Sequence, residues 1–530
     1  MSFGIGDRCD CRIAARRSSV VGVTIPTVTP AQSSPLAPLQ REAAPPRTVV
    51  LLLLFGTVTA VLFNDGIGGI AVTLVSLLLL ATVSASVYQK RPAHLGLAAA
   101  TVLTALVFSV RSSPWVLIPT ALALTALLLT WVSLPRSVSV FDISWRTATG
   151  ILRGSVAEAS RAPLWAVGGA ASMAQTGSRQ KLLGWLRGVA IALPLLVGLF
   201  LLLASADPVF GSVVRPALSA EAATATLLTG VAATFAAVIL TRLARRGGVV
   251  PAYRAASPRL GRHEAVVVLG SVATLFAAFV AVQLFTSRGG GLSQLQAEGI
   301  TVAEYARSGY FQLLGVVFIS AVVIMAIDGL RNSAAGTRAS ERALSVVIIL
   351  LTLTILVVAM TRLSLYIDTF GLTMLRLSCI VAAIWMGTLL LILCAWVLGW
   401  GTNRNWLLGA IGLSLLVTTL GFAAVNPEAR VAAFNIDRPS QQATDLTYLT
   451  TLSHDAVPTV LESIDSLEPQ DAQALLQALC QRHDQDTPWR RWTLAQEAAN
   501  ASLQGRCLIE SAPSEFRDRE PAIFTGTVNV

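Results

Sequence analysis

Residues 343–361 read ALSVVIILLTLTILVVAMT, an apolar run without a charged residue. A helix needs about 20 apolar residues to cross the hydrocarbon core of a bilayer, with about 17 as the lower bound. Similar runs lie at 48–63, 66–88, 95–110, 113–134, 188–206, 222–241, 265–285, 311–328, 377–400 and 405–425. The charged residues lie at the ends of these runs or in the connections between them. The sequence therefore predicts an all-α polytopic transmembrane bundle of about eleven spans.

The composition agrees with a membrane protein. Charged residues make up 13% of the chain, whereas a soluble globular protein carries about 25%. The mean hydropathy is +0.67. The net charge of +10 comes almost wholly from arginines between the apolar runs, so we attribute it to membrane orientation and expect no nucleic-acid partner.

The first and third runs are short for a membrane span. Because Asn64 and Asp65 separate the first run from the second, these two runs could form one helical hairpin with a tight turn there. The number of crossings keeps the same parity in both cases.

The arginines and lysines orient the bundle. With the amino terminus inside, the inner connections collect most of them: Lys90, Arg91, Arg136, Arg146, Arg153, Arg161, Arg179, Lys181, Arg187, Arg242, Arg245, Arg246, Arg254, Arg259, Arg262, Arg331, Arg338, Arg342 and Arg404. The outer connections hold far fewer: Arg111, Arg215, Arg288, Arg307, Arg362 and Arg376. Cytoplasmic loops of membrane proteins carry such an excess. We therefore expect a cytoplasmic amino terminus, an extracytoplasmic carboxyl terminus and a multi-pass protein of the bacterial plasma membrane.

This pattern divides the chain into five parts. Residues 1–47 are predicted as a disordered basic cytoplasmic arm and 48–134 as the first four transmembrane helices. The connection 135–187 spaces Trp145, Trp165 and Trp185 among arginines, which is typical of a helix lying in the headgroup layer, although a solvated loop is an alternative. Residues 188–425 are predicted to form a bundle of seven spans. Residues 426–530 are predicted to form a small helical appendage outside the membrane.

Two features are predicted within this appendage. Helices are expected to open at Glu468-Pro469-Gln470 and at Thr487-Pro488, the latter running towards Leu503. Cys480 and Cys507 lie on the oxidising side of the membrane in this topology. We therefore predict a disulfide between them.

Acidic, basic and aromatic residues gather at the outer ends of the later spans. We predict one polar cluster there, made of Asp207, Glu304, Tyr305, Arg307, Arg362, Tyr366, Asp368 and Arg376. Arginine can bind a carboxylate or a phosphate with two parallel hydrogen bonds, so the cluster could receive an anionic lipid or an envelope component. The alternative is that these are ordinary interfacial residues.

The same positions carry a family resemblance. The segments Leu203 to Phe210, Thr301 to Leu313, Arg362 to Arg376, Phe434 to Arg438 and Asp445 to Pro458 resemble a bacterial membrane family known only as a domain of unknown function, the 4153/4173 group. The resemblance runs from about Arg187 to about Leu461. It implies an architecture and candidate positions but no activity.

Cofactor and metal signatures do not appear in the sequence. The adjacent residues Ser453, His454 and Asp455 spell the letters of a catalytic triad, but neighbours in sequence do not place a nucleophile, base and orienter in a relay. Asp455 is instead predicted to start a helix. We expect no metal, no cofactor and no assignable catalytic residue.

Three functions fit these observations. A structural or interaction protein of the cell envelope is favoured, because charged residues are missing from the spans and the appendage is small and helical. A transporter or flippase of a polar or lipidic substrate is the first alternative, although such proteins usually keep an ionisable group at bilayer depth. A membrane enzyme acting on a lipid-linked substrate at the outer face is the second. Its weakness is that the Asn64-Asp65 connection is too short to build a substrate cleft.

Overall fold

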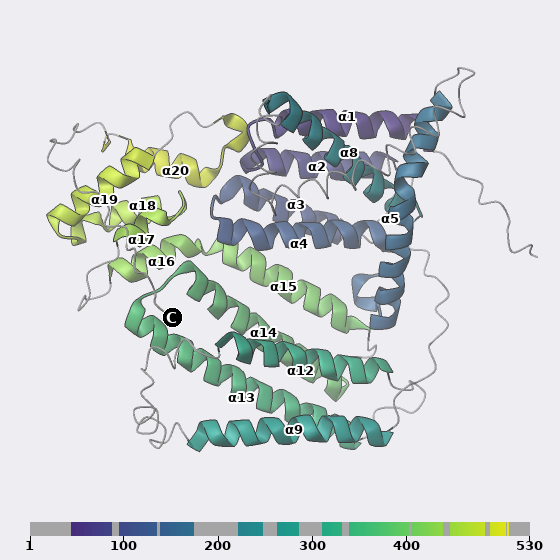
Figure 1. Ribbon diagram of the computed structural model, residues 1–530, viewed down its shortest axis with the longest axis vertical. Helices are drawn as coiled ribbons and strands as arrows, with labels where there is room; N and C mark the ends of the chain where they lie inside the picture. Colours follow the sequence, from purple (N-terminus) through teal and green to yellow (C-terminus); the bar gives the residue numbers. More distant parts are fainter. Residues whose placement is uncertain are drawn as a thin grey trace, which may run out of the picture. The chain divides into compact units, whose positions relative to one another are not determined.

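The computed structural model describes residues 44–86, 95–134, 138–173, 221–246, 262–285, 310–330, 339–401, 405–437, 446–482, 488–504 and 506–507. These segments are helices and short connections, with no strand among them (Figure 1). They belong to one compact unit, Ala43–Val530. The predicted all-α fold class is confirmed for this part of the chain.

The long apolar helices coincide with the predicted apolar runs. They are α1 (Pro46–Leu62), α2 (Gly69–Ser86), α3 (Leu95–Val110), α4 (Pro114–Ser133), α8 (Glu221–Arg246), α9 (Arg262–Phe285), α12 (Tyr310–Leu330), α13 (Ala339–Phe370), α14 (Met374–Leu398) and α15 (Trp406–Ala424). Among the described residues, 7 helices are long and apolar enough to cross a membrane, and α1, α3 and the apolar part of α12 are shorter. The run at 188–206 lies outside the described residues. The chain is a multi-pass membrane protein.

Local sequence sets several helix boundaries. The side chain of Thr373 accepts a hydrogen bond from the backbone N–H of Arg376, which caps the start of α14, and Gly399 ends that helix in the left-handed conformation with φ 86°. Gly371, with φ 78°, ends α13 in the same way. Glycine adopts this conformation without a steric cost, which is why it terminates helices so often. The connection between α13 and α14 is therefore short and sharply turned.

Helices α1 and α8 approach each other very closely. A Cβ atom on Gly56 would lie 1.8 Å from Oγ1 of Thr234 and 2.8 Å from the carbonyl oxygen of Gly230. Small residues let two membrane helices bring their backbones together and gain dispersion contacts along their length. The core around this crossing includes Leu52 of α1 and Val238 of α8.

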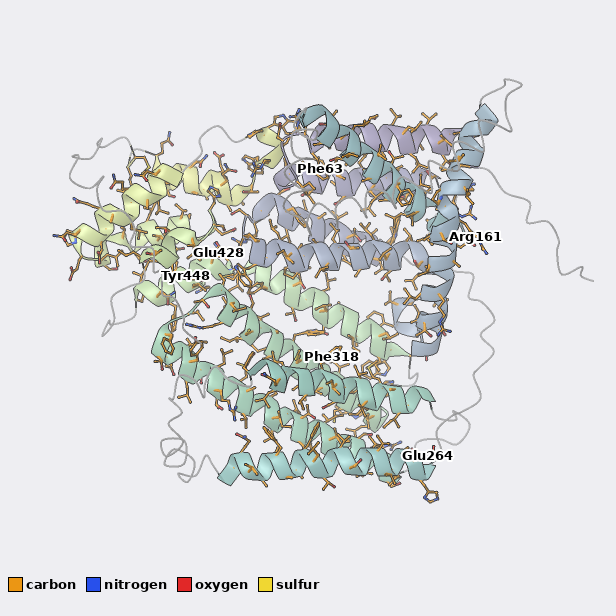
Figure 2. The ribbon with its side chains drawn as sticks, viewed as in Figure 1. Phe63, Arg161, Glu264, Phe318, Glu428 and Tyr448 are labelled. Carbon is orange, nitrogen blue, oxygen red and sulfur yellow. A yellow bond between two sulfur atoms is a disulfide. The ribbon has the colours of Figure 1, made fainter. Side chains whose placement is uncertain are left out.

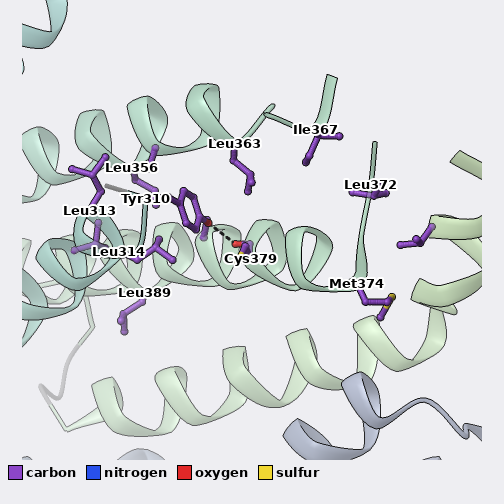
Figure 3. Close-up of a cluster of buried hydrophobic side chains, with 14 of the residues drawn as sticks. Tyr310, Leu313, Leu314, Leu356, Leu363, Ile367, Leu372, Met374, Cys379 and Leu389 are labelled. Atoms are coloured by element: carbon purple, nitrogen blue, oxygen red, sulfur yellow. Dashed lines mark hydrogen bonds between the residues drawn. The ribbon is translucent and has the colours of Figure 1, made fainter. Parts of the chain in front are cut away.

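A second core joins α9, α12, α13 and α14 (Figure 3). Ile348, Ile355 and Leu390 are almost completely buried in it. Tyr310, at the start of α12, donates a hydrogen bond from its hydroxyl to the backbone carbonyl of Cys379 on α14 at 2.9 Å. A buried hydroxyl needs such a partner because no water is available to it in hydrocarbon. Helix α15 then packs against α14 on one side and against α4 on the other.

Helix α5 (Trp145–Met173) occupies most of the connection predicted at 135–187. Residues 145–173 are thus a helix and not a solvated loop. Figure 1 shows α5 crossing the ends of several bundle helices. The Ser155 hydroxyl donates to that of Ser133 at the end of α4, and the carbonyl of Trp165 accepts from the N–H of Ala44 just before α1. The short helix η2 (Val140–Asp142), which precedes α5, packs against α15.

The chain after α15 forms the appendage, defined here as the described residues from 427 to 507. Its elements are α16 (Pro427–Ile436), α17 (Leu446–Thr451), α18 (Val457–Glu462), η5 (Ile464–Ser466), α19 (Pro469–Arg482), η6 (Trp489–Arg491) and α20 (Leu494–Leu503). The predicted helix start at Pro469 is confirmed. The predicted start at Thr487-Pro488 is wrong, because a 3-10 turn intervenes and Thr493 caps α20 by accepting from the backbone N–H of Gln496.

Candidate functional site

The densest polar contacts in the described chain join the appendage to the ends of the bundle helices. We call this set the docking network. It consists of Arg111, Ser112, Ser113, Asn426, Glu428, Ser453 and Asp455. Figure 2 shows Glu428 on the appendage side of the bundle.

The first half of the docking network is the connection between α3 and α4. Only Arg111, Ser112 and Ser113 separate the two helices, and Pro114 opens α4. A helix start exposes backbone N–H groups that have no partner within the helix. Ser113 stands at the N-cap position but makes no capping hydrogen bond with its own side chain. Another group must therefore satisfy these donors.

Asp455 of the appendage supplies that group. Its Oδ2 accepts from the backbone N–H of Ser112 at 2.7 Å and from that of Ser113 at 2.8 Å. The same oxygen accepts from the hydroxyls of Ser112 and Ser453. Its Oδ1 pairs with the Arg111 guanidinium at 3.2 Å, and the Asp455 side chain is 1% exposed. Helix α18 begins at Val457, two residues after the predicted start at Asp455, and Ala456 stands at its N-cap position. The Asp455 carboxylate does not cap this helix but bonds to the two residues that precede α4.

Glu428 forms the second carboxylate of the network. Its Oε1 accepts from the Ser113 hydroxyl at 2.5 Å, and its Oε2 accepts from the backbone N–H of Ser453 at 2.6 Å. Glu428 is 2% exposed and lies in the first turn of α16. A carboxylate at that end of a helix is also stabilised by the helix dipole.

Arg111 and Asn426 close the network against the backbone. Arg111 donates from Nε to the carbonyl of Ala423 at 2.8 Å and from Nη2 to that of Ala424 at 3.1 Å, at the end of α15. Asn426 adopts a positive φ of 53° and donates from its side chain to the carbonyl of Asp455 at 2.8 Å. Asparagine tolerates this conformation better than most residues. Each member therefore bonds to at least one other element.

The position of Arg111 at the end of α3 explains why each polar group of the docking network needs a hydrogen-bond partner. Helix α3 has 16 residues, which corresponds to about 24 Å at about 1.5 Å per residue. The hydrocarbon core is about 30 Å thick, so an α3 that crosses it would leave its carboxyl end close to the hydrocarbon boundary. Unpaired polar groups are costly there. Both carboxylates are bonded to partners within the chain, and these bonds join the appendage to the bundle.

Two further contacts fix the appendage on the bundle. Asn435 of α16 exchanges two hydrogen bonds with the backbone of Leu372, between α13 and α14, at 2.9 and 2.7 Å. The Tyr448 hydroxyl accepts from the backbone N–H of Met374 at 2.7 Å. Figure 2 labels Tyr448 on this side. The appendage is thus attached to α3, α4, α13, α14 and α15 together.

The predicted outer cluster is described only in part. The Arg376 guanidinium lies 4.3 Å from the ring centroid of Tyr366 and donates to the carbonyls of Phe370 and Gly371 at the end of α13. Arg362 instead donates to the side-chain carbonyl of Gln283 on α9 at 3.0 Å. Asp368 is exposed. Asp207, Glu304, Tyr305 and Arg307 lie outside the described residues, so a single cluster remains a prediction.

The opposite end of the first helices carries a different set of contacts. Arg242 near the end of α8 pairs with Glu158 of α5 at 3.1 Å, and both Arg242 and Arg245 lie over the Trp165 ring. Arg245 also donates to the carbonyl of Ser86, which ends α2. Arginines at the carboxyl ends of helices interact favourably with the helix dipole. This end is therefore basic and bound to α5, whereas the other end is bound to the appendage.

Cys480 and Cys507 are joined by a disulfide that links α19 to the residues after α20, with the two Cα atoms 5.6 Å apart. The described cysteines Cys379 and Cys394 are free and lie in α14. In the described part of the chain, no group of three or more His, Cys, Asp and Glu side chains could hold a metal ion.

Removal of this disulfide should loosen the appendage. The bond closes a loop with a sequence separation of 27 residues. Replacing both Cys480 and Cys507 with serine should lower the free energy of unfolding of the appendage by about 3 kcal/mol, because the unfolded loop regains conformational entropy. Hydrogen exchange of α19 and α20 in nanodiscs measures the loss. Unchanged exchange rates would show that the disulfide contributes nothing to stability.

The fold and the docking network together define a class: a multi-pass helical membrane protein with a helical appendage fixed to one end of its bundle. The chain belongs to the family described as "Domain of unknown function (DUF4153)", whose model matches residues 98–463. The expected resemblance is confirmed, and the match starts earlier than the expected Arg187. It includes α3 from residue 98 onward, the whole of α4 and every member of the docking network. Comparisons with the curated proteins and with the solved structures gave no match.

Proposed function

We propose that this protein is a structural or interaction protein of the bacterial cell envelope, in which the membrane bundle holds the appendage at the outer face for a partner to bind. The docking network is the observation that carries this proposal. Its buried carboxylates connect Asp455 and Glu428 of the appendage to the start of α4. A binding surface held in this way loses little conformational freedom when its partner binds, which favours affinity.

The alternation of the helix ends supports eleven crossings. The appendage bonds to residues at the end of α3 and the start of α14, whereas α5 bonds to residues at the ends of α4 and α8. Asn64, after α1, accepts a hydrogen bond from Thr226 near the start of α8, which supports a start of α8 on the appendage side. One more crossing is then needed between α5 and α8, and the sequence offers the apolar run 188–206 for it.

Charge and redox chemistry support the orientation. The end bound to α5 carries Arg242, Arg245 and Arg246 on α8, together with Arg153 and Arg161 on α5 itself. Such an excess of arginine marks the cytoplasmic side. The Cys480–Cys507 disulfide belongs to the appendage, and disulfides persist in oxidising compartments outside the cytoplasm. Both observations favour a cytoplasmic amino terminus and an extracytoplasmic appendage.

Two features disfavour the transport and enzyme alternatives. Several hydroxyl groups in the described spans are bonded to the backbone of the preceding turn, as for Thr59, Thr120 and Thr352, whose acceptor distances are 2.8, 2.7 and 2.7 Å. They are therefore engaged in their own helices and not presented along a path. Asp65, the carboxylate of the short Asn64-Asp65 connection, is ion-paired with Arg490 at 2.5 Å.

Site-specific photocrosslinking tests the interaction role. We expect a photoreactive amino acid at Gln473 or Gln477, both exposed on α19, to give discrete protein adducts in living cells. The matched control is the same amino acid at Val357, which is 61% exposed on α13 and faces lipid in our topology. The Gln473 adducts should disappear in an Asp455→Ala background while the amount of protein stays equal. Absence of adducts from both α19 positions, or adducts that persist in Asp455→Ala, would contradict the proposal.

A further inference from the structure

The turn η6 carries an unusual set of exposed side chains for a segment at the end of two membrane helices. Trp489 is 59% exposed, Trp492 36% and Leu494 52%, and Ile67 of the α1–α2 turn is 77% exposed. Large exposed apolar side chains that gather in one place mark an interaction surface. We call these four residues, together with Arg491, the anchor surface.

Backbone contacts fix the position of the anchor surface relative to the first turn of α2. The carbonyl of Trp492 accepts a hydrogen bond at 3.0 Å from the N–H of Ile70, in the first turn of α2. Gly69 adopts a φ of +56°, and a Cβ atom there would lie 2.4 Å from the carbonyl carbon and oxygen of Arg491. Only glycine allows the turn to lie this close to α2. The tryptophans are therefore held at the level of the first residues of a membrane helix.

Helix length places that level at the membrane surface. Helix α1 has 17 residues and is about 25 Å long at about 1.5 Å per residue, less than the hydrocarbon thickness of about 30 Å. Because α1 is shorter than the hydrocarbon, moving the α1–α2 turn out into the water would pull apolar side chains at the other end of α1 deeper or out of register with the membrane. The turn therefore stays close to the headgroups. Tryptophan is enriched at this boundary because its ring is apolar while its N–H can bond to water or headgroups.

The charges of the surface fit phospholipid headgroups. Arg490 is paired with Asp65 and lies 5.5 Å from the centroid of the Trp489 ring. Arg491 is exposed beside it, and its guanidinium suits a phosphate that accepts two hydrogen bonds.

We propose that the anchor surface inserts into the lipid headgroup layer on the appendage side, with Trp489, Trp492, Leu494 and Ile67 at the acyl boundary and Arg491 on a lipid phosphate. The appendage is thereby fixed to the bilayer as well as to the bundle. This inference requires membrane insertion of α1 and α2 but no envelope partner.

Fluorescence quenching in nanodiscs tests the insertion. Trp489→Cys and Leu494→Cys, labelled with an environment-sensitive fluorophore, are compared with Gln473→Cys, in a background where Cys9 and Cys11 are serine and Cys379 and Cys394 are alanine. Phospholipids brominated on the acyl chain should quench the labels at 489 and 494 several-fold more than the label at 473, while aqueous iodide should show the reverse order. The use of two labelled sites keeps the test valid if one variant fails to fold.

Two outcomes would overturn the proposal. Equal iodide quenching at 489, 494 and 473 would show that the surface lies in water. Shielding of 489 and 494 from both iodide and brominated lipid would show that protein covers it. For the phosphate contact, Arg491→Glu should weaken lipid quenching at 489 in nanodiscs of phosphatidylglycerol while Arg491→Lys preserves most of it; equal quenching in the two variants would remove that contact.

Discussion

Replacing Asp455 with alanine should release the appendage from the bundle. The change removes the ion partner of Arg111 and the acceptor for the backbone N–H groups of Ser112 and Ser113. Breaking a buried ion pair by removing one partner costs about 3–5 kcal/mol, because the other charge stays buried without its counter-ion. Hydrogen exchange of α17 and α18 in nanodiscs should therefore accelerate by about a hundredfold or more, since each factor of ten corresponds to about 1.4 kcal/mol.

An exposed ion pair provides the matched control. Arg161 pairs with Glu158 within α5, and its side chain is 55% exposed. Arg161→Ala should cost less than about 1 kcal/mol, because solvent screens such pairs. Asp455→Asn should fall between the two, since it keeps an acceptor oxygen but loses the charge. Equal effects of Asp455→Ala and Arg161→Ala would show that the docking network does not hold the appendage.

Replacing Gly56 with leucine should prevent α1 and α8 from packing. A single Cβ atom at this position already overlaps Thr234 and approaches the backbone of Gly230. Ordinary overpacking costs about 1–3 kcal/mol, but here the contact involves backbone atoms that cannot move without separating the helices. We expect Gly56→Leu to remove most of the folded protein from the membrane fraction. The readout is the amount of monodisperse protein after mild detergent extraction.

Gly270 of α9 is the control for this change. No heavy atom lies within 4 Å of a Cβ built on it, so Gly270→Leu should leave the yield of folded protein unchanged. Both substitutions add the same apolar side chain to a membrane helix. If Gly56→Leu accumulates as well as Gly270→Leu, the close crossing of α1 and α8 is not required for the fold.

Much of the architecture could be predicted because the bilayer imposes a simple rule on sequence. Each described apolar run became a helix, and the starts of α14 and α19 follow from nearby threonine and proline residues. The rule is local: about 20 consecutive residues must be apolar to cross the hydrocarbon. Whether a segment meets this rule can be read from its own residues, with no knowledge of the tertiary contacts.

The docking network could not be predicted because it is not local. Arg111 and Asp455 are 344 residues apart in sequence, and no periodic pattern links them. The local sequence predicts that Asp455 starts a helix, but its carboxylate bonds across the fold to the two residues before α4. One signal was present: Arg111 is among the few arginines predicted outside and lies in a connection of only three residues between two spans. Such a charge at the hydrocarbon boundary needs a partner.

Labelling of single cysteines in intact cells tests the proposed arrangement most directly. Gln473, exposed on α19 of the appendage, and Ala157, exposed on α5, are each replaced with cysteine in the background in which Cys9, Cys11, Cys379 and Cys394 are substituted. A membrane-impermeant maleimide should label Gln473→Cys in intact cells and Ala157→Cys only after the membrane is permeabilised. Labelling of Ala157→Cys in intact cells, with Gln473→Cys reactive only after permeabilisation, would contradict an appendage held at the outer face.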